Sequence, residues 1–115
     1  MAVQTVLMRN SLATKYGVSA THGALYTTVP GGTAGTEVTG GTPAYARKVW
    51  SWGAAAASAV TATAAVFDVP ASTTIAGAGN HDALTAGNYL DGAAVTNQAF
   101  ASQGTYSLTP TYTQS

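Results

Sequence analysis

The sequence contains no cysteine in its 115 residues. This absence excludes a disulfide framework and any metal site built on thiolates. A chain without such cross-links has to be held together by packing or by partners. A chain of this length can bury roughly two-thirds of its unfolded surface around one modest core. We therefore predict a single domain over residues 1–115.

Charged side chains are also scarce. They make up 7% of the residues, against about 25% in ordinary soluble domains, and the formal net charge is zero. Neutral, weakly charged surfaces tend to associate, so the composition favours a protein held in an assembly. The alternative is a soluble secreted domain that is solvated by its Thr, Ser and Asn side chains. The chain also lacks the basic excess that nucleic-acid binding requires, and we expect no nucleic-acid partner.

Long hydrophobic runs are missing as well. The most apolar run, residues 53–67, consists mostly of Ala and Thr and ends before Asp68 and Pro70, so it is too short and too weakly apolar to cross a bilayer. The first twelve residues carry Arg9 within their apolar stretch and no basic region before it, which is the wrong order for a signal peptide. We expect no membrane insertion.

What the sequence does contain is a series of short patterned segments. Residues 3–16 place Met8, Leu12 and Tyr16 at helical spacing, with Gly17 as a stop, which predicts one amphipathic helix; a strand is the alternative. Further segments punctuated by Gly and Pro predict strands at 23–32, 43–53, 58–69, 70–79, 93–104 and 105–113, with loops at 33–43 and 80–92. The predicted fold is mainly β, a small β-sandwich or barrel-like antiparallel sheet with one short N-terminal helix.

The last predicted strand has the clearest alternation. Tyr106, Leu108, Pro110 and Tyr112 fall on one face, while Thr and Ser occupy the positions between them. This is the period of a half-buried strand, and β-branched Thr favours a pleated surface. We predict that residues 105–113 pair with a sheet, either that of the same chain or that of a neighbour.

Groups that could perform catalysis are few. His22, His81, Asp82 and Asp91 would suit a metal site in principle, but the adjacent pair His81 and Asp82 would point to opposite sides of a strand and is more typical of a turn. There is no G-x-S-x-G motif, and no Lys-Ser or Lys-Thr pair follows the Gly-rich stretches. We expect no catalytic residue, no metal and no cofactor, and hence no enzyme.

Aromatic residues supply the candidates for an interaction surface. In the segment 43–53, Trp50 and Trp52 fall on one side, where they would anchor a core or an interface. Arg47 and Lys48 are too few to indicate nucleic-acid binding, and we expect Arg47 to pair with a carboxylate or with a neighbouring subunit. The predicted interface residues are Arg47, Trp50, Trp52, Tyr106 and Tyr112.

Three stretches of the chain resemble a known group of proteins. They are GGTPAYARKVWSWGAA (40–55), VFDVPASTTIAG (66–77) and FASQGTYSLTPTYTQS (100–115). Together they resemble the small virion proteins of tailed phages that infect actinobacteria, which are often labelled tail fibre or minor structural proteins. The resemblance implies a virion component, assembled in the bacterial cytoplasm. Its partners would be copies of itself and other virion proteins, such as the major capsid protein or tail proteins.

Two virion roles and one other role follow as expectations. A fibre shaft needs a long repetitive segment, which this chain lacks, so decoration of the capsid exterior is the first expectation. The second is a tail-fibre or tail-tip subunit involved in host attachment. The third is a carbohydrate-binding module that would use Trp50, Trp52, Tyr89 or Tyr106 as exposed stacking platforms.

Overall fold

The structure is a computed structural model and describes residues 4–114. Among these residues, one helix is followed by eight strands. They are α1 (Val6–Ser19), β1 (His22–Tyr26), β2 (Lys48–Val49), β3 (Ala59–Thr61), β4 (Ala65–Val69), β5 (Thr73–His81), β6 (Tyr89–Phe100), β7 (Gly104–Leu108) and β8 (Thr111–Thr113). The predicted class, mainly antiparallel β with one short N-terminal helix, is confirmed.

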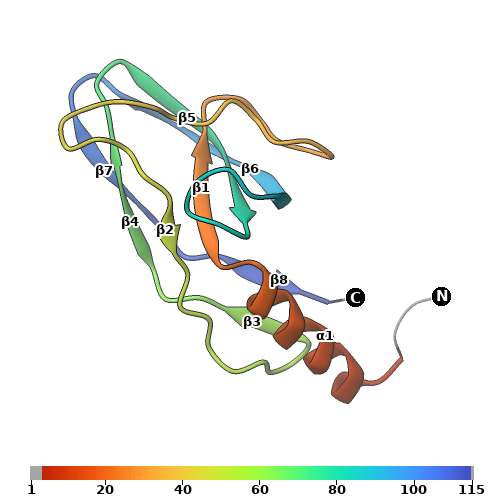
Figure 1. Ribbon diagram of the computed structural model, residues 1–115. Coiled ribbons are helices and arrows are strands. Elements are labelled where there is room, and N and C mark those ends of the chain that lie inside the picture. The colour runs from red at the N-terminus through yellow and green to blue at the C-terminus, as the bar shows by residue number, and fades with distance from the viewer. Residues whose placement is uncertain (1–3, 115) are drawn as a thin grey trace.

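The strands form two bodies that differ in width. The first is a four-stranded antiparallel sheet in the order β2-β1-β5-β6. The second is a narrow ribbon, in which β4 pairs with β7 and β3 pairs with β8, so that residues 59–69 run antiparallel to residues 104–113. The molecule is elongated, 47 × 25 × 24 Å, with α1 beside β3 and β8 at one end and the larger sheet toward the other (Figure 1).

The C-terminal segment is part of this ribbon. Tyr106, Leu108, Pro110 and Tyr112 are half-buried, and the hydroxyl residues between them are exposed, as the alternation predicts. The predicted single strand is divided into β7 and β8 at Thr109 and Pro110, where proline has no N–H to offer a ladder, although its carbonyl accepts from the Ala62 N–H at 3.0 Å. The segment pairs with its own chain.

The helix lies later in the chain than predicted. It covers Val6–Ser19, begins at an N-cap where the Thr5 hydroxyl accepts from the Met8 N–H at 3.2 Å, and continues through Gly17. Gly17 lies inside the helix and does not mark a stop. A Cβ at this position would stand 3.1 Å from Trp52, so the small size of glycine permits the close approach of the indole. Residue 3, the predicted start, lies outside the described residues. No helix among residues 4–114 has the length and apolar character to cross a membrane.

Several strand boundaries also differ from the prediction. Segment 43–53 contributes only the two residues of β2, because the chain then turns away and the Trp50 N–H bonds to the Thr21 carbonyl at 2.9 Å. Segment 58–69 is two strands, β3 and β4. The predicted loop at 80–92 is shorter, since β5 continues to His81 and β6 starts at Tyr89.

The core lies between the large sheet and the ribbon. Its buried members are Leu25, Val38, Trp50, Ala62, Phe67, Val69 and Ile75. The Trp50 ring meets Phe67 edge to face, with centroids 6.0 Å apart. Gly23 of β1 lies directly under the indole, where a Cβ would overlap it. A glycine on the strand therefore makes room for the largest side chain of the core.

Candidate functional site

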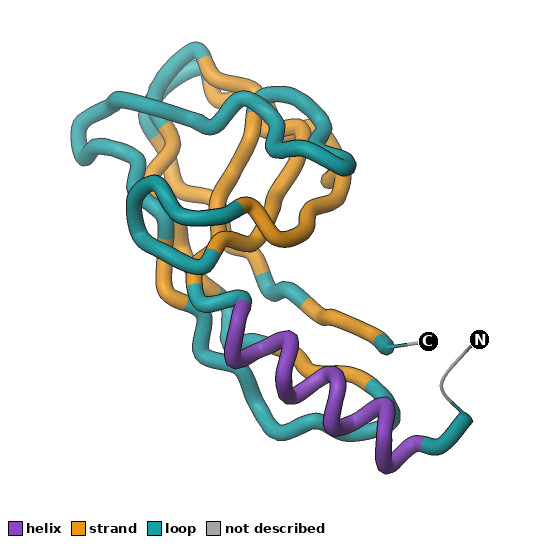
Figure 2. Tube along the Cα trace, turned by 45° about the vertical axis from the view of Figure 1, so that its right-hand side comes forward, coloured by secondary structure: helices purple, strands orange, loops and turns teal. Residues whose placement is uncertain are grey.

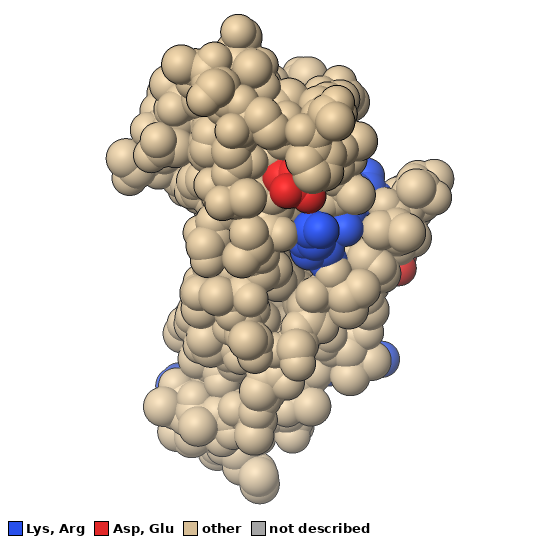
Figure 3. Space-filling model, turned by 90° about the vertical axis from the view of Figure 1, so that its left-hand side faces the viewer, with Lys and Arg blue, Asp and Glu red and all other residues tan. Residues whose placement is uncertain are grey.

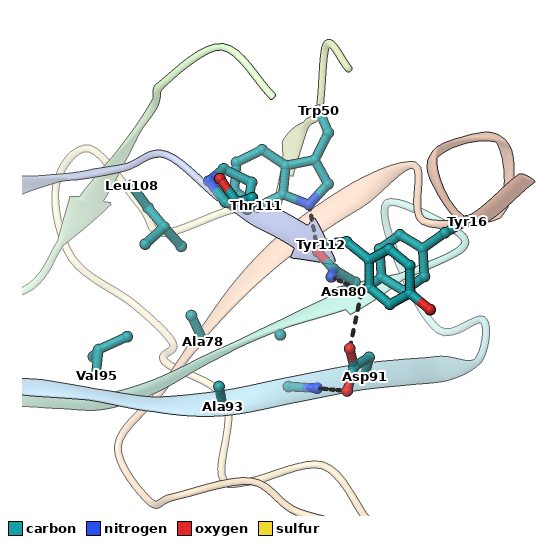
Figure 4. Close-up of a pocket in the computed structure, with 13 residues that line it drawn as sticks. Tyr16, Trp50, Ala78, Asn80, Asp91, Ala93, Val95, Leu108, Thr111 and Tyr112 are labelled. Carbon is teal, nitrogen blue, oxygen red and sulfur yellow. Dashed lines mark hydrogen bonds between the residues drawn. The ribbon is translucent and has the colours of Figure 1, made fainter. Parts of the chain in front are cut away.

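A cleft of about 190 Å³ opens where the large sheet, the ribbon and α1 meet. Its apolar side is formed by Ala78 and Ala93 of the sheet with Val95 and Leu108 (Figure 4). The remaining lining residues are Tyr16, Trp50, Gly79, Asn80, Asp91, Gly92, Pro110, Thr111 and Tyr112. Small side chains on β5 and β6 leave this space open, since a larger residue at Ala78 or Ala93 would occupy it.

A chain of hydrogen bonds crosses one end of the cleft (Figure 4). The Trp50 indole N–H donates to Asn80 Oδ1 at 2.6 Å, and the Asn80 amide donates to the Tyr16 hydroxyl at 2.5 Å. The Tyr16 hydroxyl in turn donates to Asp91 Oδ2 at 3.1 Å. Burial, together with the nearby Asp91 carboxylate, raises the pKa of Tyr16 well above its usual value. Tyr16 is therefore a neutral donor that joins the helix to both strands.

Two of the predicted interface residues, Trp52 and Tyr112, pack on the Tyr16 ring. Tyr112 of β8 stacks flat on its ring, with centroids 3.8 Å apart, and Trp52 contacts it edge to face at 5.9 Å. The Trp52 indole N–H also donates to the Ala20 carbonyl at the end of α1, at 2.7 Å. Trp50 and Trp52 lie side by side, 6.3 Å between centroids, as their alternation predicts. Trp50 is buried, so it is not the exposed stacking platform that a carbohydrate-binding module would need.

Arg47 and Tyr106 lie away from the cleft. The Arg47 guanidinium holds Glu37 through two hydrogen bonds of 2.9 Å and also donates to the carbonyls of Ala83 and Ala86. The carboxylate partner expected for Arg47 is thus found within the chain. Tyr106 of β7 is half-buried opposite Phe67 of β4 and packs against the core.

The Glu37 carboxylate is held by two residues. Burial of Glu37 opposes its ionisation, but hydrogen bonds from Arg47 and from Tyr45, at 2.8 Å, outweigh that effect and lower its pKa. On the face in Figure 3, acidic and basic atoms meet at one place, and most of the surface is uncharged. The Arg47–Glu37 pair fixes the loop that contains Ala83 and Ala86.

The two histidines are opposite each other on paired strands. His22 of β1 is the register partner of His81 of β5. His81 is buried, its Nε2 bonds the Tyr26 hydroxyl at 2.5 Å, and its Nδ1 has no hydrogen-bond partner among residues 4–114. Burial, with the nearby Arg47 charge, lowers the pKa of His81. Within residues 4–114, no three His, Asp or Glu side chains come together as a metal site requires.

Sequence reasoning missed the residues that hold the cleft together. The sequence pattern places Tyr16 on an apolar helix face and Asn80 in a loop, and it suggests Asp91 only as a possible metal ligand. They are separated by 64 and 75 positions in the chain, so no local pattern places them together. The polar groups of the cleft bond mainly to one another, which is the arrangement of a structural junction.

The fold is thus mainly β with a largely uncharged surface, and its cleft is crossed by polar groups that bond to one another. Comparison with protein families identifies its class: a family model described as "Podophage GP4 fiber I protein gp80" matches residues 4–110. The chain belongs to this family of phage fibre proteins, and it is a bacteriophage virion structural protein. The actinobacterial host inferred from the three quoted stretches stays a prediction. No curated protein and no solved structure matches the chain.

Proposed function

We propose that the chain is a non-enzymatic subunit of a fibre on a podophage particle, where it contacts copies of itself and other virion proteins. The observation that carries this proposal is the fibre-family match over residues 4–110, which spans α1 and every strand except β8. The matched family is described as a fibre, so it supports the second sequence expectation and gives no support to capsid decoration.

Two structural features agree with a fibre subunit. The molecule is about twice as long as it is wide, and its C-terminal strands are ordered along its length. The chain carries few charges, which suits repeated close contacts, because charged groups are costly to desolvate. A fibre subunit does not have to catalyse a reaction. The polar side chains of the cleft hydrogen-bond to one another, which agrees with such a role.

Labelling of intact particles tests the proposal. Antibody fragments raised against the purified chain, carrying gold, should bind at fibres in electron micrographs of the phage that encodes it. Fibres dissociated from the particles should also contain the chain by mass spectrometry. Gold spread evenly over the head shell, with the chain retained on full heads that lack tails and fibres, would instead support capsid decoration and overturn the proposal.

A further inference from the structure

His81 is a buried histidine whose ring is only half satisfied. It is the last residue of β5 and is 5% exposed. Its Nε2 bonds the Tyr26 hydroxyl, whereas its Nδ1 is buried without a hydrogen-bond partner among residues 4–114. Buried polar atoms in folded proteins are nearly always paired, so an unpaired ring nitrogen at this position needs a physical reason.

The surroundings of His81 accept only the uncharged ring. A neutral imidazole has one N–H and one bare nitrogen, and a hydroxyl can serve either of them, because it can accept as well as donate. The single bond to Tyr26 therefore satisfies one side of the neutral ring. A protonated imidazole has two N–H groups, and the one on Nδ1 would be buried without an acceptor. Uptake of a proton by His81 thus requires that Nδ1 gain access to water.

The charged and titratable side chains around His81 do not supply the missing acceptor. They are Arg47, Glu37, Asp82, His22, Tyr26 and Tyr89. The Arg47 guanidinium opposes a second positive charge nearby. Both carboxylates already accept hydrogen bonds, Glu37 from Arg47 at 2.9 Å and Asp82 from the Asn88 N–H at 2.7 Å. The charged ring is therefore unfavourable as long as it stays in place.

The loop of residues 82–88, directly after His81, is the part of these surroundings that can move. Its residues are exposed except for Ala83, which is half-buried, so little apolar burial holds the loop. Arg47 attaches it through bonds to the carbonyls of Ala83, at 3.1 Å, and Ala86, at 2.8 Å. In addition, the register of β5 against β6 is irregular between Asn80 and His81. The sheet ladder is thus interrupted where the loop begins.

The other neighbours of His81 are fixed in the fold. Tyr26 is fully buried, and its ring lies so close to Gly79 that a Cβ there would stand 2.7 Å from it. The segment that follows β1 covers the same face, with Pro30 in contact with Gly77. Figure 2 shows loops surrounding the strand-rich end of the molecule, away from the N-terminal end of α1. Water therefore reaches Nδ1 most readily from the side of loop 82–88.

We propose that His81 is an acid-sensitive switch for the loop of residues 82–88. At neutral pH the uncharged ring stays buried and the loop stays attached to Arg47. On protonation the ring turns toward water, and the loop opens and detaches from Arg47. The loop forms one wall of an open hollow of about 420 Å³, opposite Tyr45 and Arg47, so its release changes the shape of this surface. The switch involves this chain alone and does not depend on the proposed function.

Amide hydrogen exchange of the full chain, measured by NMR at pH 7.5 and pH 5.5, tests the switch. The reporter is the Asn88 N–H, which bonds the Asp82 carboxylate across the loop. Opening that takes up one proton becomes up to tenfold more favourable for each pH unit below about 6.5, the ordinary histidine pKa. After correction for intrinsic exchange, protection of this N–H should therefore fall roughly tenfold. The pKa values of Glu37 and Asp82 are lowered, so neither carboxylate takes up a proton in this range.

A ribbon amide shows whether the opening is local. The Ala62 N–H, which donates to the Pro110 carbonyl, should remain at least tenfold better protected than the Asn88 N–H at pH 5.5. Equal exchange of the two amides would mean that acid unfolds the whole chain, and it would overturn the proposal. Exchange of Asn88 that does not change with pH would do the same, and both results come from the unaltered chain.

Two variants assign the effect to His81. His81→Gln removes the titrating group, so the pH dependence of the Asn88 exchange should shrink to about twofold or less. His22→Gln is the matched control, because it makes the same change at the register partner on β1, and it should keep the roughly tenfold dependence. A dependence that persists in His81→Gln, or that disappears in His22→Gln, would show that His81 is not the switch.

Discussion

Tyr112, near the C-terminal end, lies flat on Tyr16 of the N-terminal helix, with ring centroids 3.8 Å apart and an interplanar angle of 7°. The contact joins the N-terminal helix α1 to the C-terminal strand β8 at the edge of the cleft. It adds to the pairing of β8 with β3 in holding the C-terminal strands in place.

The first prediction concerns this contact. Tyr112→Ala should lower the free energy of unfolding by about 2 kcal/mol, through lost apolar burial and the lost aromatic pair. Tyr112→Phe is the control: it keeps the ring and loses only the hydrogen bond to Gln114, so the loss should stay near or below about 1 kcal/mol. Urea denaturation followed by tryptophan fluorescence measures both. Equal losses in the two variants would contradict the importance of the stacking.

Removal of the whole segment should have a larger effect. Deleting residues 105–115 takes away the strands that pair with β3 and β4 and uncovers Phe67 and Val60. The shortened chain should fail to fold, as judged by circular dichroism, and should fail to enter particles. A truncated chain that folds and is incorporated normally would show that the segment is dispensable.

The close approach at Gly23 gives a sharper test of the core. Gly23→Ala places a Cβ where the Trp50 indole lies, so the indole or the strand must shift, and we expect a loss of about 3 kcal/mol or more. Gly31→Ala is the matched control, because nothing lies within 4 Å of its added Cβ, and its effect should stay within about 0.5 kcal/mol. Similar stability of the two variants would be evidence against the Trp50 position described here.

The ion pair between Arg47 and Glu37 should stabilise the fold, and Arg47 should also stabilise the loop whose carbonyls it bonds. The side chains are 11% and 26% exposed, so a double-mutant cycle of Arg47→Met and Glu37→Gln should give a coupling energy of about 1–3 kcal/mol. Arg47→Met should also speed hydrogen exchange in residues 83–86, because two of their carbonyls lose a donor. A coupling near zero, as at exposed ion pairs, would refute the assigned geometry.

Acid should destabilise the fold in the pH range where the pKa of His81 differs between the folded and the unfolded chain. Its pKa is lowered in the folded chain, so below the ordinary value of about 6.5 the unfolded chain binds a proton that the folded chain does not. The free energy of unfolding should therefore fall with decreasing pH, by up to about 1.4 kcal/mol per pH unit, from about pH 6.5 downward. Denaturation at pH 7 and pH 5.5 measures this slope, and His81→Gln should largely abolish it. An unchanged slope in His81→Gln would assign the effect to another group.

The sequence predicts those parts of the fold that depend on local periodicity. Alternation over residues 105–113 identifies the half-buried ribbon, because a strand exposes every second side chain whatever it pairs with. The helix begins three residues later than the sequence predicts, and the predicted stop at Gly17 is wrong. Gly17 is needed for the close approach of Trp52, which lies 35 positions away in the chain.

The cleft could not be predicted, for a related reason. Asn80 and Asp91 look like loop residues because short polar side chains near glycine are typical of turns. In the structure they lie opposite each other on the paired strands β5 and β6, Asn80 also pairs with Gly23 of β1, and the helix supplies the Tyr16 hydroxyl that both side chains bond. Long-range partners decided these positions, and a single sequence does not contain that information.

The ribbon also determines how the molecule would respond to force. Its inter-strand hydrogen bonds run across its long axis, from β4 and β7 at one pole to β3 and β8 beside α1 at the other (Figure 1). Tension between the poles would load these bonds together in shear, whereas tension that draws β8 away from β3 would break them one after another. A load carried along the long axis therefore meets the stiffest direction of this fold.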